Sequence, residues 1–359
     1  MARPTQAQLN LAALRHNVRL VRERAPAAKL MAVVKADAYG HGAVTISNAL
    51  SNLVDALAVA CMEEAIELRD AGIDTPILLL EGVFDEGELP LAAARKLWIT
   101  VENRQQLQWL ERTSLSNPIQ CWLKVDTGMN RLGVPRDAWR DYYERLCELP
   151  QANGRPVLFT HLSSADNINS DATERQLSRF LSLDCDGPRS ICNSAGVIAW
   201  PQAHFDWVRP GYMLYGYSPM RNATDVCRQL RPVMSLTSSI ISVREVEAGE
   251  SVGYDGLWVA PRHSRIATVA VGYGDGYPRH APTGTPVLIE GQLAPLVGRV
   301  SMDMITVDIT ELSHVDMGSP VTLWGEGLRL EDIARRAGTI GYELTSRIPS
   351  RTPRVISAD

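Results

Sequence analysis

The chain has 359 residues, of which 41 are acidic and 36 are basic, and its formal net charge is −5. This acidic balance argues against a nucleic-acid partner, because proteins that bind nucleic acids normally present a basic face. No apolar run is long enough to span a bilayer and the amino terminus has no signal-peptide core, so we expect no membrane partner and a cytoplasmic location.

The six cysteines and seven histidines are scattered along the chain. The cysteines form no CxxC pair and most lie in apolar stretches, a pattern that predicts reduced and mostly buried thiols. The histidines form no HxxxH or HExxH pattern, so we predict no metal site.

The first strong element is LMAVVKADAYGHG, from Leu30 to Gly42. Its apolar run predicts a short strand that is buried on both faces, ends at Lys35 and enters a polar turn containing glycine. A half-buried lysine at the end of such a strand loses hydration, which favours the free amine needed for Schiff-base chemistry. The alternative is a lysine whose side chain simply reaches solvent.

Short apolar runs alternate with longer amphipathic ones up to about Pro210. About eight strands that alternate with helices indicate an α/β protein with a (β/α)8 TIM-type barrel. An open doubly wound sheet is the alternative, although no glycine fingerprint for a dinucleotide follows the first strand. The predicted strands cover residues 30–35, 56–60, 76–82, 97–101, 119–126, 156–162, 189–195 and 204–211.

In a barrel of this type, functional side chains lie at the carboxyl ends of the strands. The polar residues at the predicted strand ends are Lys35, Lys124, Asp126, His161, Asn193, Ser194 and Arg209. The barrel topology therefore gathers side chains from distant parts of the chain into one candidate site.

Beyond about Met234 the pattern changes to segments rich in Val, Ile and Thr, which alternate with period two between turn signals. This pattern indicates a mainly β domain with one short helix at LEDIARRAG. We therefore predict two domains, with residues 1–232 forming the barrel and residues 233–359 forming the C-terminal β domain. The first few residues of the chain are expected to join the β domain as an extra strand.

Seven motifs occur in the order and spacing of bacterial alanine racemases. They are VVKADAYGHG, LKVDTGMNRLG, HFDWVRPG, VGYDGLW, GYGDGYPRHAPTGTPV, GRVSMDM and GYEL, and they are divided between the two predicted domains. The chain thus resembles the alanine racemases of fold type III, which depend on pyridoxal 5′-phosphate. The resemblance covers nearly the whole chain and implies interconversion of L-alanine and D-alanine, which supplies D-alanine for peptidoglycan.

The resemblance implies that Lys35 carries the cofactor as an internal aldimine, and that the cofactor accepts the electrons released when the Cα proton of alanine leaves. Two bases then exchange that proton, Lys35 on one face and Tyr254 on the other. A phenol titrates at about pH 10 and is a poor base at neutral pH, so positive charge is needed beside it. His161 matches the histidine that the family places there. Taken alone, Tyr254 fits an amphipathic tyrosine in a hairpin.

The resemblance also sets Arg209 against the pyridine nitrogen of the cofactor. Arginine only donates hydrogen bonds and keeps its proton, so that nitrogen stays unprotonated, which favours prompt reprotonation at Cα over transamination. The alternative for Arg209 is a surface cation beside a Pro-Gly turn. The other matching cofactor contacts are Tyr39, Asn193, Ser194, the backbone at Gly211, and Tyr342.

Substrate contacts follow from the same motifs. Arg131 matches an arginine that contacts the phenolic oxygen of the cofactor and the carboxylate of the substrate. Lys124 matches a lysine that is often carbamylated to hold that arginine, a change that exchanges repulsion for a charge-assisted bond. The backbone N–H of Met302 and the side chain of Asp303 match further substrate contacts, and Tyr273 matches a tyrosine that narrows access to the substrate.

Because Lys35 lies on the predicted barrel and Tyr254 on the β domain, the resemblance implies a homodimer with shared active sites. Tyr254, Met302 and Asp303 would then come from the other subunit. Two positions depart from the common pattern, since many relatives have Asn in place of Asp37 and often have Gly in place of Asp255. These departures leave the substrate range open.

Other functions remain as alternatives. A racemase of broader specificity, acting on serine or lysine, would carry the same motifs. The related pyridoxal-phosphate barrel decarboxylases share the barrel-plus-β architecture, but GMNRLG and VGYDGLW fit racemases better. A pyridoxal-phosphate carrier protein would consist of the barrel alone, and the long segment beyond Met234 argues against it.

Overall fold

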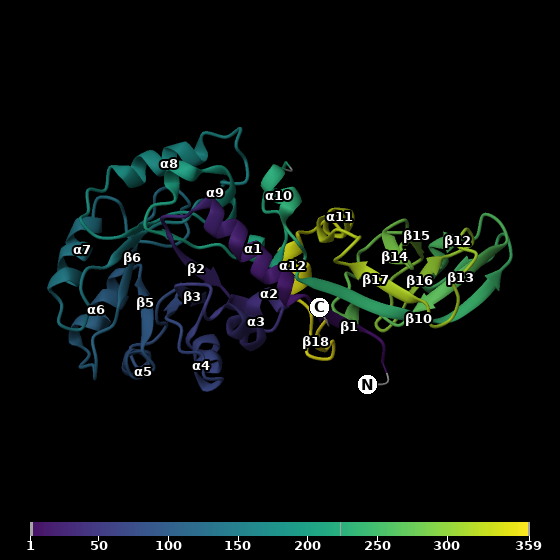
Figure 1. Cartoon of the computed structure of the whole chain (residues 1–359), viewed down its shortest axis with the longest axis horizontal. Helices are drawn as coiled ribbons and strands as arrows, with labels where there is room; N and C mark the ends of the chain where they lie inside the picture. The colour runs from purple at the N-terminus through teal and green to yellow at the C-terminus, as the bar shows by residue number, and fades with distance from the viewer. Residues whose placement is uncertain (1–2, 223, 358–359) are drawn as a thin grey trace.

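A closed barrel of parallel strands forms the first region of the computed structural model, which describes residues 3–222 and 224–357 (Figure 1). The barrel closes where β9 pairs with β2, with Lys29 opposite Trp207 and Leu30 opposite Val208. This closure confirms the (β/α)8 prediction and excludes the open doubly wound sheet. The barrel strands are β2 (Lys29–Val33), β3 (Ala56–Val59), β4 (Ile77–Leu79), β5 (Leu97–Val101), β6 (Cys121–Lys124), β7 (Val157–Phe159), β8 (Arg189–Ser190) and β9 (Trp207–Val208).

Bulky side chains fill the barrel interior. Trp122 is fully buried there, and its ring centroid lies 5.5 Å from those of both Phe159 and Trp207. Met31 and Leu78 belong to the same buried cluster. Because this packed interior leaves no passage along the axis, a ligand site must lie at an end of the barrel.

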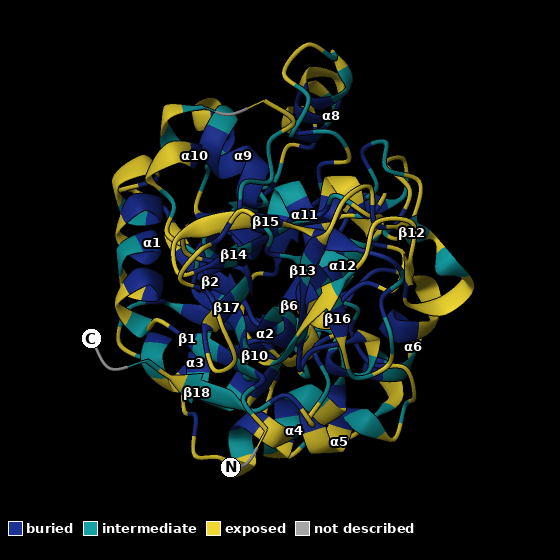
Figure 2. Ribbon diagram, turned by 90° about the vertical axis from the view of Figure 1, so that its right-hand side faces the viewer, coloured by how far each residue is buried: buried dark blue, intermediate teal, exposed yellow. Residues whose placement is uncertain are grey.

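Helices surround the barrel strands, and the longer ones have an apolar side that packs inward. Helix α1 shows how one of them starts, because the side chain of Asn10 accepts a hydrogen bond from the Ala13 N–H and caps the helix. Its buried face includes Leu14, Val18 and Val21, and exposed residues follow the outer side (Figure 2). The helices of this region are α1 (Leu11–Arg24), α2 (Lys35–Gly40), α3 (Ala43–Leu50), α4 (Met62–Asp70), α5 (Glu88–Ala94), α6 (Arg104–Arg112), α7 (Trp139–Glu148), α8 (Ala172–Leu181), α9 (Ser194–Ala199) and α10 (Asp225–Gln229).

An 8-stranded sheet forms the second region, as the mainly β pattern predicted. Strand β1, from the start of the chain, lies between β10 and β18, antiparallel to the first and parallel to the second. A separate two-stranded ribbon joins β11 (Ser251–Val252) to β12 (Trp258–Val259). The strands of the large sheet are β1 (Gln6–Leu9), β10 (Met234–Val246), β13 (Ser264–Val269), β14 (Pro286–Ile289), β15 (Gln292–Val297), β16 (Ile305–Asp308), β17 (Pro320–Trp324) and β18 (Arg354–Ile356).

Two helices, rather than the single one expected, follow β17. Helix α11 (Leu330–Arg336) is the predicted one, and α12 (Gly341–Ser346) is too short to show an apolar period in the sequence. Helix α12 packs on α2 so closely that a Cβ on Gly40, whose φ is +81°, would lie 1.8 Å from the carbonyl oxygen of Thr345. Helix α12, near the C-terminus, therefore packs against the segment that follows the first barrel strand.

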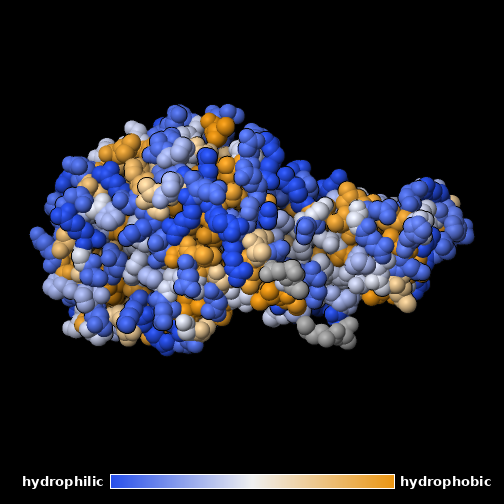
Figure 3. Space-filling model, in the orientation of Figure 1, coloured by the Kyte–Doolittle hydropathy of each residue, from blue (hydrophilic) through white to orange (hydrophobic). Residues whose placement is uncertain are grey.

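The cysteines are free thiols, as predicted, but only three are buried: Cys121, Cys192 and Cys227. Within the described residues, none of the helices combines the length and apolar composition required to cross a membrane. Hydrophilic side chains dominate the face shown in Figure 3, with apolar side chains gathered in smaller groups between them.

Candidate active site

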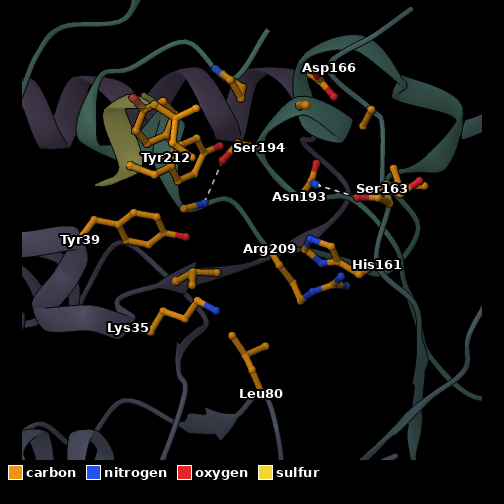
Figure 4. A pocket seen from close by; sticks show the side chains of 18 of the residues that line it. Lys35, Tyr39, Leu80, His161, Ser163, Asp166, Asn193, Ser194, Arg209 and Tyr212 are labelled. Carbon is orange, nitrogen blue, oxygen red and sulfur yellow. Dashed lines mark hydrogen bonds between the residues drawn. The ribbon is translucent and has the colours of Figure 1, made fainter. Parts of the chain in front are cut away.

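A cavity of about 500 Å³ opens at the carboxyl ends of the barrel strands (Figure 4). Its volume falls within the range of about 300–1,000 Å³ that is common for small-molecule sites. Every cofactor contact expected from the motifs lines this one cavity. These residues are Lys35, Tyr39, Arg131, His161, Asn193, Ser194, Arg209, Gly211 and Tyr342.

Lys35 stands half-buried where β2 ends, at the start of a turn with unusual backbone geometry. The four residues from Ala36 to Tyr39 have φ between 52° and 54°, in the left-handed region. Left-handed geometry costs L-residues about 1–2 kcal/mol each, so contacts from outside the turn must hold it. The N–H of Ala36 donates to Glu64 Oε1 at 2.7 Å, which is one such contact.

Asp37 anchors the same turn and accounts for one of the departures noted in the sequence. Its Oδ1 accepts a hydrogen bond from the N–H of Ala43 at 2.7 Å, and its Oδ2 lies 3.2 Å from Arg354 Nη2. The carboxylate therefore joins the Lys35 turn to the first residue of β18.

His41, a residue not predicted from the sequence, is fully buried next to the turn. Its Nδ1 lies 3.0 Å from the carbonyl oxygen of Ala38 and 2.9 Å from that of Tyr39. Burial lowers the pKa of His41 to about 4, so the ring is neutral at pH 7 and Nδ1 is the donor to both carbonyls. The HG that closes the VVKADAYGHG motif was the signal for this residue.

Hydroxyl groups converge on one end of the cavity. Burial raises the pKa of Tyr39 to about 12 and that of Tyr342 further still, so both phenols stay protonated and can donate hydrogen bonds. Ser194 Oγ accepts from the N–H of Gly211 at 3.0 Å, which leaves its own O–H free to donate into the cavity. A Cβ on Gly211 would lie 2.6 Å from the Tyr39 hydroxyl oxygen, so glycine makes room for that hydroxyl.

Asn193 and Asp126 serve the backbone rather than the cavity. Asn193 is the N-cap of α9, where its side-chain oxygen accepts from the Gly196 N–H at 3.0 Å. Asp126 Oδ1 accepts from the N–H groups of Gly128, Met129 and Asn130 and fixes the loop that carries Arg131. Asn193 still borders the cavity, whereas Asp126 does not line it.

Arg209 lies at the inner wall of the cavity with only 3% of its surface exposed, so the alternative of a surface cation is wrong. Its Nη2 donates to the carbonyl oxygen of Thr160 at 2.7 Å, and its Nη1 donates to Ser190 Oγ. The guanidinium carbon lies 5.0 Å from the centre of the Phe159 ring. Burial lowers the pKa of Arg209 to about 10, so the side chain keeps its charge at neutral pH.

His161 borders the same wall, beside Arg209 (Figure 4). Burial, and then the charges of Arg209, Arg131, Lys124 and Lys35, lower its pKa to about 3. The imidazole is therefore neutral at pH 7. The imidazole itself therefore does not supply the positive charge that the resemblance requires beside Tyr254, and the cations near His161 are the arginines and lysines.

Lys124 does not line the cavity and pairs with a carboxylate that was not predicted from the sequence. Its Nζ is 3.5 Å from Glu102 Oε2, and both side chains are more than nine-tenths buried. Glu102 directly follows β5, so the rule that singled out the other strand-end residues applied to it as well.

The candidates on the β region lie outside this cavity of the same chain. Tyr254, in the 3₁₀ helix η3 (Tyr254–Gly256), is 66% exposed, and Met302 is 52% exposed. Tyr273 begins the 3₁₀ helix η4 (Tyr273–Asp275) and is also exposed. Asp303 Oδ1 accepts from Arg351 Nη2 at 2.6 Å. A single chain therefore assembles the barrel half of the expected site and leaves the other half on its surface.

Asp255, the second departure noted in the sequence, has a physical explanation. Its φ is +60°, a value that glycine adopts freely and that Asp tolerates better than most residues. Its Oδ2 also lies 3.2 Å from Arg299 Nη1, so the carboxylate gains an ion pair that glycine would lack.

Comparisons with known proteins match this geometry along almost the whole chain. The model of the alanine racemase N-terminal domain matches residues 9–219, and that of the alanine racemase C-terminal domain matches residues 233–356. An alanine racemase of Chromohalobacter salexigens is 50% identical over 356 residues, covering 99% of this chain and 98% of that protein. A catabolic alanine racemase of Pseudomonas putida is 48% identical over 358 residues, covering 98% of each.

A solved structure supports the same relationship. The biosynthetic alanine racemase of Pseudomonas aeruginosa superposes with a TM-score of 0.95 at 46% identity, covering 99% of this chain and 100% of that one. Both domain models, the sequence relatives and the superposed structure agree, and the chain therefore belongs to the alanine racemase family.

Proposed function

We propose that the chain interconverts L-alanine and D-alanine with pyridoxal 5′-phosphate bound in the barrel cavity. The observation that carries this proposal is that Lys35, Arg209, His161 and the hydroxyls of Tyr39 and Tyr342 line one cavity. The relatives named alanine racemase support the choice of substrate.

The residues of the cavity fit the proposed cofactor. An amine, that of Lys35, is available for covalent attachment, and protonated hydroxyls of Tyr39, Ser194 and Tyr342 suit a dianionic phosphate. Gly211 makes room for the Tyr39 hydroxyl, which is one of these donors. When bound, pyridoxal phosphate supplies a conjugated ring that delocalises the electron pair left on Cα after deprotonation.

The chain's own residues position and exchange the proton. In the proposed mechanism Lys35 Nζ removes or returns the Cα proton on one face, and the Tyr254 hydroxyl of a second copy does so on the other. Arg209 is charged and only donates hydrogen bonds, so a ring nitrogen that faces it remains an acceptor. Because His161 is neutral, the positive charge that favours deprotonation of the Tyr254 hydroxyl would come from Arg209, Arg131 and Lys124, the same charges that lower the pKa of His161.

Substrate binding is proposed to use both regions. Arg131, which lines the cavity, would bind the substrate carboxylate through its guanidinium. Met302 and Asp303 would complete the site from the second copy, and Tyr273 would narrow the approach to it. The exposure of Tyr254, Tyr273 and Met302 in one chain supports a homodimer with two shared sites.

The remaining parts of the proposal concern domain limits and setting. We place the domain boundary between residues 232 and 233, which agrees with the start of β10 at Met234 and with the start of the second family match at residue 233. We propose a cytoplasmic enzyme that supplies D-alanine for peptidoglycan. Relatives described as biosynthetic and as catabolic both match, so a catabolic role is the competing assignment.

The test is to incubate purified holoenzyme with L-alanine in heavy water and to measure both Cα deuterium and the D/L ratio. D-alanine that carries deuterium at Cα is the expected result, because each base exchanges its proton with solvent. Deuterium without inversion would mean that only one base works. Neither exchange nor inversion of alanine would contradict the proposal, and serine and lysine would be tested next.

A further inference from the structure

Glu102 and Lys124 meet because of the barrel register. Strands β5 and β6 pair Thr100 with Trp122 and Val101 with Leu123, so the next position places Glu102 opposite Lys124. Side chains two positions apart point to the same side of a strand. Lys124 therefore points inward like Trp122, and Glu102 reaches it across neighbouring strands, at 3.5 Å between Oε2 and Nζ.

The backbone at Glu102 is held firmly. Its N–H donates to Gln106 Oε1 at 2.9 Å, and Gln106 Nε2 donates to the carbonyl oxygens of Glu81 and Val83. One buried side chain thus ties the end of β5 to the loop after β4. These contacts hold the backbone from which the Glu102 carboxylate reaches Lys124.

The surroundings of the pair are rich in positive charge. Burial lowers the pKa of Lys124 and the charges of Arg131 and Arg209 lower it further, whereas the charge of Glu102 opposes this shift. Burial likewise raises the pKa of Glu102, and the charges of Lys124 and Arg131 oppose that rise. Within the part of the chain that the structure describes, Glu102 Oε2 is buried and accepts no hydrogen bond. A buried anionic oxygen without a hydrogen-bond donor is costly, so its attraction to the Lys124 ammonium group 3.5 Å away compensates part of that cost.

We propose that Glu102 is a positioning residue that supplies a permanent anion beside Lys124 and Arg131, so that Lys124 stays an unmodified ammonium ion and is not carbamylated. This inference rests on the proposed function only in the role of Arg131 as the group that binds the substrate carboxylate. Glu102 acts on that group through charge and through Lys124, without touching the substrate.

The chemistry of carbamylation explains why Glu102 opposes it. In that reaction a neutral lysine amine attacks carbon dioxide, an N–C bond forms, and one proton passes to water, which leaves a negatively charged carbamate. A carboxylate 3.5 Å away stabilises the ammonium form that cannot react. It would also repel the carbamate once formed. A second anion would be redundant for Arg131, because Glu102 already provides one.

The direct test is ¹³C NMR of the holoenzyme equilibrated with ¹³C-bicarbonate. Wild-type protein should show no carbamate resonance that disappears in Lys124→Ala. Glu102→Gln keeps the side-chain shape, removes the charge, and should gain such a resonance. Glu81→Gln, which removes a nearby negative charge outside the pair, is the matched control and should behave as wild type. A Lys124-dependent carbamate resonance in the wild type would overturn the proposal.

Kinetics test the positioning role separately. Without bicarbonate, Glu102→Gln should raise the KM for alanine by about tenfold, the effect of weakening one charge-assisted contact, with a smaller change in kcat. Added bicarbonate should restore part of the loss, and Glu81→Gln should respond to neither condition. Unchanged KM in Glu102→Gln would remove the positioning role. If wild-type protein failed to racemise alanine, the function would be wrong, while the NMR result would still decide whether Lys124 is modified.

Discussion

The barrel mouth and the β region contribute to the expected site in opposite ways. At the mouth, Arg209 and His41 are buried and held by hydrogen bonds to backbone carbonyls of the same chain. On the β region, Tyr254 and Met302 are more than half exposed. Apolar neighbours such as Leu257 and Met304 are exposed as well.

This difference distinguishes side chains that the same chain holds in position from side chains that are expected to complete a site only in a second copy of the chain. The barrel fixes its candidates through strand register and burial, so their substitution should affect folding as well as activity. The exposed candidates of the β region should affect activity alone, because substitution of a surface side chain usually changes stability little.

The largest expected effect tests whether the two regions meet between subunits. Lys35→Ala and Tyr254→Phe should each lower racemisation by at least about 100-fold, because each removes one of two proton-transfer groups. When equal amounts of the two variants exchange subunits, half of the dimers are mixed and each mixed dimer has one intact site. Activity should then recover to about a quarter of the wild-type value. Mixing without recovery would contradict shared sites.

The barrel and its strand-end residues could be predicted from the sequence because the chemistry and the topology obey one simple rule. All the parallel strands end at the same side of the barrel, so the sequence was sufficient to predict that Lys35, His161 and Arg209 lie in one site. The β sheet was equally readable from its period of two. The resemblance to a family then assigned a role to each side chain.

What the sequence did not reveal depends on contacts between distant elements. The partner of Lys124 follows from the register of β5 against β6, and a sequence does not display register. Likewise, the acidic residue at position 37 is explained by its contact with Arg354, which lies 317 positions later in the sequence. Helix α12 was missed because its six residues owe their conformation to packing on α2.

Substitution of Arg209 tests whether a buried cavity residue of the barrel contributes to the stability of the fold. Arg209→Gln leaves the carbonyl of Thr160 without its buried donor, and we expect the free energy of unfolding of the apo-protein to fall by about 2–3 kcal/mol. Urea denaturation measures this change. The exposed Arg228, which pairs with Asp225, is the control, and Arg228→Gln should unfold as wild type does. Met302→Ala should likewise leave the free energy of unfolding unchanged. A loss in Met302→Ala as large as that in Arg209→Gln would contradict the distinction between buried barrel residues and exposed residues of the β region.

His41 should make the barrel mouth sensitive to acid. Its folded-state pKa of about 4 lies below the ordinary value of 6.5, so the unfolded chain binds more protons between these two pH values. Stability is therefore complete above pH 6.5 and is lost as the pH falls toward 4, by about 2–4 kcal/mol from this residue. His41→Asn should show a correspondingly smaller loss in urea titrations across this range. Equal slopes for His41→Asn and wild type would refute the assignment.

The smallest expected effect concerns the ion pair between Arg354 on the β sheet and Asp37 in the lysine turn. Asp37 is about half exposed, so Asp37→Asn should cost less than about 1 kcal/mol, and the cost should shrink in high salt. Arg354→Met should cost more, because Arg354 also donates to the carbonyl oxygens of Gly40 and Ile348. If the ion pair couples the regions, the double variant loses less stability than the sum of the single losses, since each single change already removes the shared contact. Additive losses would mean that the barrel holds its left-handed turn unaided, and that the two regions are independent even where they touch.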